Sequence, residues 1–268
     1  MKHCSGKAGR IFSFGEQTCR KRGIVVKCLW QNKGKEKTTA RRDQIDLIKE
    51  AFMFKTVIFD LDGTLLDTLG DLTDASNHVC AQNGWPTFTE KQVRHMVGNG
   101  NPKLVERFTP ERLRTPEKLA ESLRQFMAYY DVHKMDRTAP YPGVPEALAA
   151  LWVAGVKTAV FSNKADAFCP SLVGHYFGDG FDVVRGKRDG VPAKPDPAGV
   201  HALMRELGAL SEETVYVGDS DVDVLTGHNA GLTVCGVTWG FRGRTELARA
   251  GAELLADSAE ELTKLLLE

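Results

Sequence analysis

The sequence predicts an α/β fold: a Rossmann-like, doubly wound parallel sheet with an inserted α-helical cap. Three observations lead to this prediction. Short apolar, β-branched runs alternate with helical patterns after Met53, a stretch without any strand pattern follows the first run, and polar side chains stand where several runs end. We therefore expect a core made of residues 53–68 and 137–268, with a helical cap at 69–136.

The strands of the core are predicted from five apolar runs. They lie at Thr56–Phe59, Lys157–Phe161, Phe181–Val184, Thr214–Val217 and Thr233–Val237, of which the third is the weakest. Helical patterns at 144–155 and 197–209 lie between some of them, with glycines near their ends. Such alternation is typical of right-handed βαβ units and of a parallel sheet covered on both faces.

The region from Leu69 to Asp136 breaks this alternation. It contains helical stretches at 71–84, 89–98 and 116–135 but no convincing strand. The alternation resumes after the turn-rich segment APYPGVPE. A helical insertion that covers the end of the first strand explains this order.

The first 52 residues differ from the rest of the chain. They hold 13 basic and 5 acidic residues, a net charge of +8, while the remaining 22 basic and 30 acidic residues give −8. They show no sustained periodicity, and Lys27 interrupts their apolar stretch. Such a segment could be a basic arm for nucleic acid or membrane, or a transit peptide. We favour a disordered or non-native extension, with Met53 as a candidate natural start.

Composition excludes several classes of protein. With 42% hydrophobic and 26% charged residues, the 268-residue chain is typical of soluble globular proteins. The longest apolar region, 147–161, is too short to span a bilayer. The six cysteines lack any CxxC spacing, which argues against a zinc site and a disulfide framework. We expect a cytoplasmic protein without nucleic-acid or membrane partners.

Polar residues gather at the predicted strand ends. In chain order these are Asp60, Asp62, Ser162, Asn163, Lys194, Asp219 and Asp223. In an open α/β sheet the ligand lies outside the carboxyl ends of the strands, so these side chains are expected to converge. Acids, a lysine, a hydroxyl and backbone amides together suit an oxygen-coordinated divalent cation and a phosphate.

The order of these motifs resembles a known family. DLDGT, a serine after the second strand, an isolated lysine before PDP, and GDSDVD follow one another as in the haloacid dehalogenase superfamily. Residues 53–268 are similar to its phosphoglycolate phosphatase-like branch, which has a helical cap after the first motif. The resemblance implies a Mg²⁺-dependent phosphoric monoester hydrolase that acts on a small phosphorylated metabolite, with 2-phosphoglycolate as the first candidate.

The resemblance also implies roles for the acids. Asp60 is expected to be the nucleophile that forms an aspartyl-phosphate, and Asp62 the general acid/base. The metal is expected to bind the carboxylates of Asp60 and Asp219 and the backbone carbonyl of Asp62. Asp223 is expected to orient Lys194 or a metal-bound water rather than to bind the metal directly.

The remaining site residues are expected to hold the phosphate. Gly63 would allow close approach of the backbone, and Thr64, Ser162 and Asn163 would hold phosphate oxygens. Lys194 would neutralise the charge of the nucleophile and of the phosphoryl group.

Two cap residues and two rival functions complete the expectations. Lys103 and Arg107, beside VGNGN, are candidate anion contacts for the substrate.

A sugar-phosphate mutase of the same superfamily would use the same aspartate pair, although Thr64 favours hydrolysis. A catalytically inactive binding protein is the other alternative, and the competent residue at every motif position argues against it.

Overall fold

The computed structural model describes residues 16–21, 24–29 and 54–268. The first two ranges are strands β1 (Glu16–Lys21) and β2 (Ile24–Leu29), which pair antiparallel, although the sequence predicted no strand there. The prediction that 1–52 is disordered or non-native otherwise lies outside the described residues.

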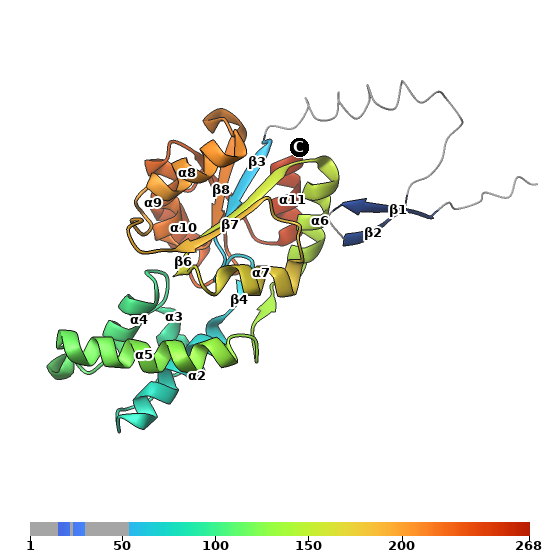
Figure 1. Ribbon diagram of the computed structural model, residues 1–268. Helices are drawn as coiled ribbons and strands as arrows, with labels where there is room; N and C mark the ends of the chain where they lie inside the picture. Colours follow the sequence, from blue (N-terminus) through green and yellow to red (C-terminus); the bar gives the residue numbers. More distant parts are fainter. Residues whose placement is uncertain (1–15, 22–23, 30–53) are drawn as a thin grey trace, which may run out of the picture.

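The core is a parallel six-stranded sheet with the order β10-β9-β8-β3-β6-β7 (Figure 1). Its strands are β3 (Thr56–Phe59), β6 (Lys157–Ala165), β7 (Val183–Lys187), β8 (Thr214–Gly218), β9 (Thr233–Val237) and β10 (Leu254–Ala256). The central strand β3 comes first in the chain. Strands β6 and β7 then form one half of the sheet, and β8, β9 and β10 form the other half. This order confirms the predicted doubly wound fold and places the switch point beside β3.

Helices cover both faces of the sheet. One group comprises α6 (Val144–Ala154), α7 (Cys169–Phe177) and α11 (Ala259–Leu267), and the other α8 (Ala198–Leu207), α9 (Asp221–Asn229) and α10 (Arg244–Ala250). Successive side chains of β3 point to opposite faces of the sheet. Val57 and Phe59 belong to the hydrophobic cluster on one face, and Ile58 to the cluster on the other. Both faces of this central strand are therefore buried.

Four further helices follow β3 and lie beyond the carboxyl ends of the strands (Figure 1). They are α2 (Leu69–Gln82), α3 (Glu90–Arg94), α4 (Asn101–Phe108) and α5 (Pro116–His133). Short strands β4 (Leu66–Asp67) and β5 (Ala139–Pro140) pair antiparallel where the chain enters and leaves this group.

A buried acid joins the beginning and the end of the inserted helices. Asp71, in the first turn of α2, accepts hydrogen bonds from the backbone N–H groups of Arg137 and Thr138, both at 2.9 Å, and from the Thr138 hydroxyl at 2.7 Å. The start of the insertion is thus fixed to its end.

Some elements differ from the sequence prediction. Strand β6 continues through Ala165, four residues past the predicted end, and β4, β5 and β10 were not predicted. The latter three have only two or three residues each, too few for a periodic pattern. The predicted helix at 89–98 ends at Arg94, and the chain then turns through Gly98 and Gly100, both of which have positive φ.

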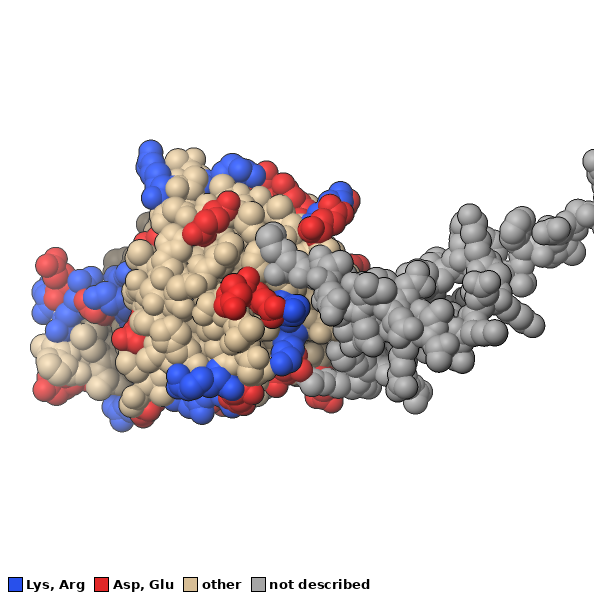
Figure 2. Space-filling model, turned by 90° about the horizontal axis from the view of Figure 1, so that it is seen from above, with Lys and Arg blue, Asp and Glu red and all other residues tan. Residues whose placement is uncertain are grey.

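The surface of the core mixes both signs of charge. On the face shown in Figure 2, acidic and basic side chains alternate among uncharged residues in the part of the chain that is described. Within the same described part, no helix combines the length and the apolar character needed to cross a membrane.

Candidate active site

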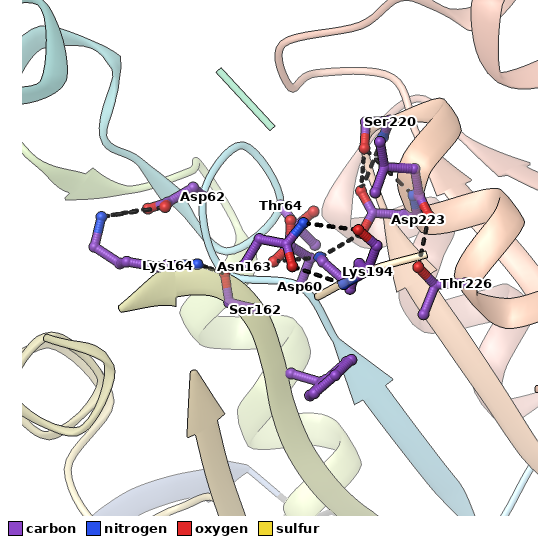
Figure 3. Close-up of polar contacts among 12 residues, drawn as sticks. Asp60, Asp62, Thr64, Ser162, Asn163, Lys164, Lys194, Ser220, Asp223 and Thr226 are labelled. Atoms are coloured by element: carbon purple, nitrogen blue, oxygen red, sulfur yellow. Dashed lines mark hydrogen bonds and ion pairs between the residues drawn. The ribbon is translucent and has the colours of Figure 1, made fainter. Parts of the chain in front are cut away.

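The centre of the site is a buried ion pair at the end of β3. Lys194 Nζ lies 2.9 Å from Asp60 Oδ1 and 2.7 Å from Asp223 Oδ1, and Asp60 is 7% exposed (Figure 3). Asp60 follows β3, Lys194 precedes α8 and Asp223 lies in the first turn of α9. The parallel sheet therefore brings together three residues that are far apart in sequence, as the strand-end argument predicted.

Asp219 completes a group of three carboxylates. One oxygen from each of Asp60, Asp219 and Asp223 lies within 4.8 Å of the others, and all three residues are buried. Asp219 Oδ1 accepts a hydrogen bond from the Thr64 hydroxyl at 3.2 Å, and Oδ2 accepts one from the backbone N–H of Phe241 at 2.7 Å. These contacts fix Asp219 between the loop after β3 and the loop after β9.

The second oxygen of Asp223 is held by its own helix. Ser220, the N-cap of α9, donates from its hydroxyl at 2.6 Å and from its backbone N–H at 3.1 Å to Asp223 Oδ2. With Oδ1 paired to Lys194, both carboxylate oxygens are engaged. This arrangement suits a side chain that orients Lys194.

Burial and the neighbouring carboxylates raise the pKa of two of the three acids, Asp60 and Asp219. Burial raises the pKa of Asp60 to about 6, with Asp223 and Asp62 adding to the rise and Lys194 opposing it. Burial, followed by Asp223 and Asp60, holds the pKa of Asp219 well above its usual range. When all three acids are ionised, the single lysine leaves two negative charges uncompensated, the charge that a divalent cation neutralises.

Two glycines allow the backbone to approach these acids. A Cβ on Gly63, which has φ +87°, would lie 2.5 Å from Asp219 Oδ2. A Cβ on Gly240 would lie 2.2 Å from the backbone oxygen of Gly63 and 2.4 Å from Asp219 Cβ. Neither position has room for a side chain, so the loops after β3 and β9 close around Asp219 only with glycine.

The residues fit a divalent metal ion. Asp60 and Asp219 offer oxygen ligands of the kind that Mg²⁺ prefers, and Asp223 adds negative charge beside them. Asp60 Oδ1 is buried and has no assigned hydrogen bond among the described residues, and the Lys194 ammonium lies 2.9 Å from it. The oxygen therefore keeps lone pairs for a ligand. The Asp62 side chain does not belong to this group.

Ser162 and Asn163 lie within β6 rather than after it. The Ser162 hydroxyl accepts a hydrogen bond from the Lys164 backbone N–H at 3.3 Å. The side-chain oxygen of Asn163 accepts from the Lys194 backbone N–H at 2.8 Å, and its Nδ2 donates to the carbonyls of Gly98 and Lys194. The Asn163 side chain thus joins the core, the Lys194 loop and the helical insertion.

Asp62 points to a different lysine. Lys164 Nζ lies 3.0 and 3.1 Å from the two Asp62 oxygens and donates to the Tyr130 hydroxyl at 2.6 Å. Burial disfavours the charge of Lys164, but Asp62 and Tyr130 outweigh this and hold its pKa above its usual range. The spacing of two residues between Asp60 and Asp62 therefore separates two ion pairs, one with each lysine (Figure 3).

A small cavity of about 30 Å³ lies between these acids and the inserted helices. The described residues that line it are Asp60, Asp62, Leu72, Val97, Gly98, Gly100, Asn101, Leu104, Ser162, Asn163 and Lys164. Helix α4 contributes Asn101 and Leu104, which are one turn apart on the same face.

Lys103 and Arg107 do not line this cavity. They lie on α4 between the buried positions, so helical periodicity turns them away from the cavity. Lys103 forms an ion pair with Glu106 at 2.8 Å, and Arg107 donates to the carbonyl of Met96 and to Asn99 Oδ1. The anion contacts predicted for Lys103 and Arg107 stay a prediction.

Lys164 and Tyr130 were missed in the sequence. Ser162 was recognised as a site residue, and side chains two residues apart on a strand point to the same side. A longer β6 would therefore have placed Lys164 beside Ser162. No sequence signal marks Tyr130, because its position depends on how α5 packs.

Comparisons with known proteins agree with this geometry. A phosphoglycolate phosphatase from Vibrio parahaemolyticus is 33% identical over 223 residues, which cover 79% of this chain and 96% of that protein. One from Cereibacter sphaeroides is 37% identical over 191 residues, covering 69% and 86%.

Solved structures give the same result. The crystal structure of a predicted phosphoglycolate phosphatase from Haemophilus somnus has a TM-score of 0.74 and 29% identity, covering 80% of this chain and 98% of that one. CbbY from Rhodobacter sphaeroides in complex with phosphate has a TM-score of 0.67 and 26% identity, covering 78% and 96%. The family model for haloacid dehalogenase-like hydrolases matches residues 57–237. The chain therefore belongs to the haloacid dehalogenase-like hydrolase family, as its four motifs predicted.

Proposed function

We propose that this protein is a Mg²⁺-dependent phosphatase that hydrolyses a small phosphomonoester through an aspartyl-phosphate on Asp60. The observation that carries the proposal is the buried group of three carboxylates with Lys194 beside Asp60, at the edge of a cavity that also receives Asp62. In this proposal α2 to α5 form the cap.

Two displacements account for the reaction. A carboxylate oxygen of Asp60 attacks phosphorus, and the bond from phosphorus to the ester oxygen breaks while Asp62 gives that oxygen a proton. Asp62 then takes a proton from a water molecule, whose oxygen attacks phosphorus and releases inorganic phosphate. Asp60 and Asp62 return to their starting forms.

The other residues would hold charge and geometry. Lys194 lies 2.9 Å from Asp60 and would offset the negative charge that gathers around the phosphoryl group. Ser162 lines the cavity, and its hydroxyl would donate a hydrogen bond to a phosphate oxygen. Asp60 and Asp219 would hold Mg²⁺, which supplies Lewis-acid stabilisation of phosphoryl oxygens when bound.

The proposed substrate is small and 2-phosphoglycolate is the first candidate. Two relatives above 30% identity are phosphoglycolate phosphatases. The CbbY structure contains phosphate, which supports a phosphate site in this fold.

We also propose a cytoplasmic location. In the described part of the chain, Cys80, Cys169 and Cys235 are free and buried. Free cysteines are usual in proteins of reducing compartments.

Release of inorganic phosphate tests the function. The purified protein is incubated with 2-phosphoglycolate, 2-hydroxyethyl phosphate, p-nitrophenyl phosphate, pyrophosphate and a nucleoside monophosphate, each with Mg²⁺ or with EDTA. We expect Mg²⁺-dependent release, with the highest kcat/KM on the two-carbon esters. A mutase would isomerise a sugar phosphate without net release, and an inactive binding protein would release nothing from any substrate; either result would refute the proposal.

A further inference from the structure

Lys164 is the one buried lysine of the cavity lining that the mechanism above leaves unused. Its side chain is 0% exposed, although an ammonium group is costly to remove from water. It stands in the middle of a chain of contacts from Asp62, on the loop after β3, to Tyr130, on α5. A charge buried in this way needs partners that offset the loss of its contacts with water.

The ammonium group of Lys164 has two partners among the described residues, the Asp62 carboxylate and the Tyr130 hydroxyl. A lysine has three N–H donors, and the acceptors here are the two oxygens of Asp62, at 3.0 and 3.1 Å, and the Tyr130 hydroxyl, at 2.6 Å. Two of these three acceptors belong to the Asp62 carboxylate. Asp62 is therefore the main partner of Lys164.

The position of Lys164 is fixed from two directions. Its backbone belongs to β6, and its ammonium lies 4.6 Å from the centre of the Tyr130 ring, which is itself fully buried. Contact with both carboxylate oxygens restricts rotation of the Asp62 side chain, as a single contact would not. The carboxylate is held at the cavity that Asp60 also lines, and it points toward Lys164 (Figure 3).

We propose that Lys164 is a positioning residue that holds the Asp62 carboxylate in the orientation for proton transfer, and that Tyr130 fixes this pair to α5 of the cap. This inference rests on the proposed function, because it assigns Lys164 its effect through the acid/base role of Asp62. It adds that the orientation of the Asp62 side chain depends on α5, a helix of the cap.

The leaving group separates this role from a merely structural one. An alkoxide such as the one released from 2-hydroxyethyl phosphate needs a proton as it departs, whereas p-nitrophenolate is a much weaker base and departs without one. Loss of proton transfer therefore slows the first displacement of the alkyl ester more than that of the aryl ester. General loss of structure slows both alike.

The experiment measures single turnovers with enzyme in excess, so that departure of the leaving group is observed before hydrolysis of the intermediate. Wild type, Asp62→Asn, Lys164→Met and the double variant are compared on the two esters. We expect Lys164→Met to slow the alkyl ester by roughly 10- to 100-fold and the aryl ester by less than about threefold, in line with the usual effect of outer-shell partners.

The double variant tests whether Lys164 acts through Asp62. If it does, Lys164→Met costs less than about threefold on the alkyl ester once Asp62 is already asparagine, because interacting residues are not additive. Equal slowing of the two esters, or additive losses in the double variant, would overturn the inference.

A matched pair of hydroxyl deletions tests the link to α5. Tyr130→Phe removes the oxygen that contacts Lys164, and Ser122→Ala removes another buried hydroxyl from the same helix. We expect Tyr130→Phe to slow the alkyl ester selectively and Ser122→Ala to change neither ester. If Lys164→Met fails to melt cooperatively, the Tyr130→Phe variant is the test of the inference. Slowing of the two esters by the same factor in Tyr130→Phe would overturn it.

Failure of the proposed function gives a different result. If wild type shows no Mg²⁺-dependent phosphate release, both proposals fall. If wild type is active and Asp62→Asn slows the alkyl ester selectively while Lys164→Met and Tyr130→Phe do not, only the positioning role is refuted.

Discussion

The ammonium group of Lys194 lies 2.9 Å from Oδ1 of Asp60, so the proposed nucleophile has a positive charge beside it within a group of three buried acids. Lys194 is itself 4% exposed and also pairs with Asp223. In the absence of a metal ion it is the cation that offsets these acids. Its removal should therefore affect both stability and chemistry.

Lys194→Met is expected to lower kcat by roughly 10²–10³-fold, the usual cost of losing one group that stabilises developing charge. It should also lower the free energy of unfolding of the metal-free protein by about 3–5 kcal/mol, because buried charges lose their partner. Phosphate release and urea unfolding in EDTA measure the two effects. Lys264→Met, on the exposed side of α11, is the control. A Lys194→Met protein with wild-type kcat would contradict the assigned role.

Asp60→Asn is expected to abolish Mg²⁺-dependent phosphate release while the fold is kept. The amide nearly preserves the shape of the carboxylate but is neither a nucleophile nor a negative ligand. Removing one of three mutually repelling acids also relieves the burial cost that raises the pKa of Asp60. Circular dichroism and single-turnover assays check both statements. Turnover that survives in protein free of contaminating phosphatase would exclude the covalent mechanism.

The sequence predicted the convergence of the acids because parallel strands end at one edge of a sheet. That rule brings Asp60 and Asp219 together without knowledge of any loop, whereas Lys194 reaches them from the loop between β7 and α8. It does not reveal the contact between Asp62 and Lys164, which are 102 positions apart. This pairing depends on the turn after β3 and on the extra residues of β6.

The sequence also did not predict which side of α4 faces the cavity. The motif VGNGN indicated that this part of the insertion faces the site, and Asn101 does line the cavity. Which side of α4 faces inward depends on its packing against α5, and that packing buries Leu104 and Val105 and leaves Lys103 outside. The position of a charged residue near a motif therefore did not reveal whether it lines the cavity.

Mg²⁺ is expected to raise the melting temperature of wild type and EDTA to abolish its activity. Saturation at about a hundredfold above Kd corresponds to about 2.7 kcal/mol of added stability. Asp219→Asn should lose this stabilisation, because it removes one of the three carboxylates. Asp221→Asn, an exposed acid two residues away, should keep it. Equal Mg²⁺-induced shifts in the two variants, measured by differential scanning calorimetry, would rule out Asp219 as a ligand.

Gly63→Ala is expected to reduce both stability and activity. Its φ of +87° is unfavourable for alanine, at a cost of about 1–2 kcal/mol, and its Cβ would meet Asp219 at 2.5 Å. Gly231→Ala is a matched control, since Gly231 has φ +71° and no atom within 4 Å of the added Cβ. Denaturant melts should show the backbone cost in both variants, and kcat should fall only in Gly63→Ala. A Gly63→Ala enzyme as active as Gly231→Ala would show that Asp219 tolerates displacement.

A chain that begins at Met53 is expected to be as active as the full chain. Every residue assigned to the site lies at Asp60 or beyond, and the family model begins at residue 57. The basic segment 1–52 has too little apolar periodicity to offset the entropy of ordering it against the core. The two chains are compared by melting temperature and by kcat/KM on 2-phosphoglycolate or, if another ester proves better, on that ester. A shortened chain that is unfolded, or slower by tenfold, which corresponds to about 1.4 kcal/mol of transition-state stabilisation, would show that the basic segment contributes to the working enzyme.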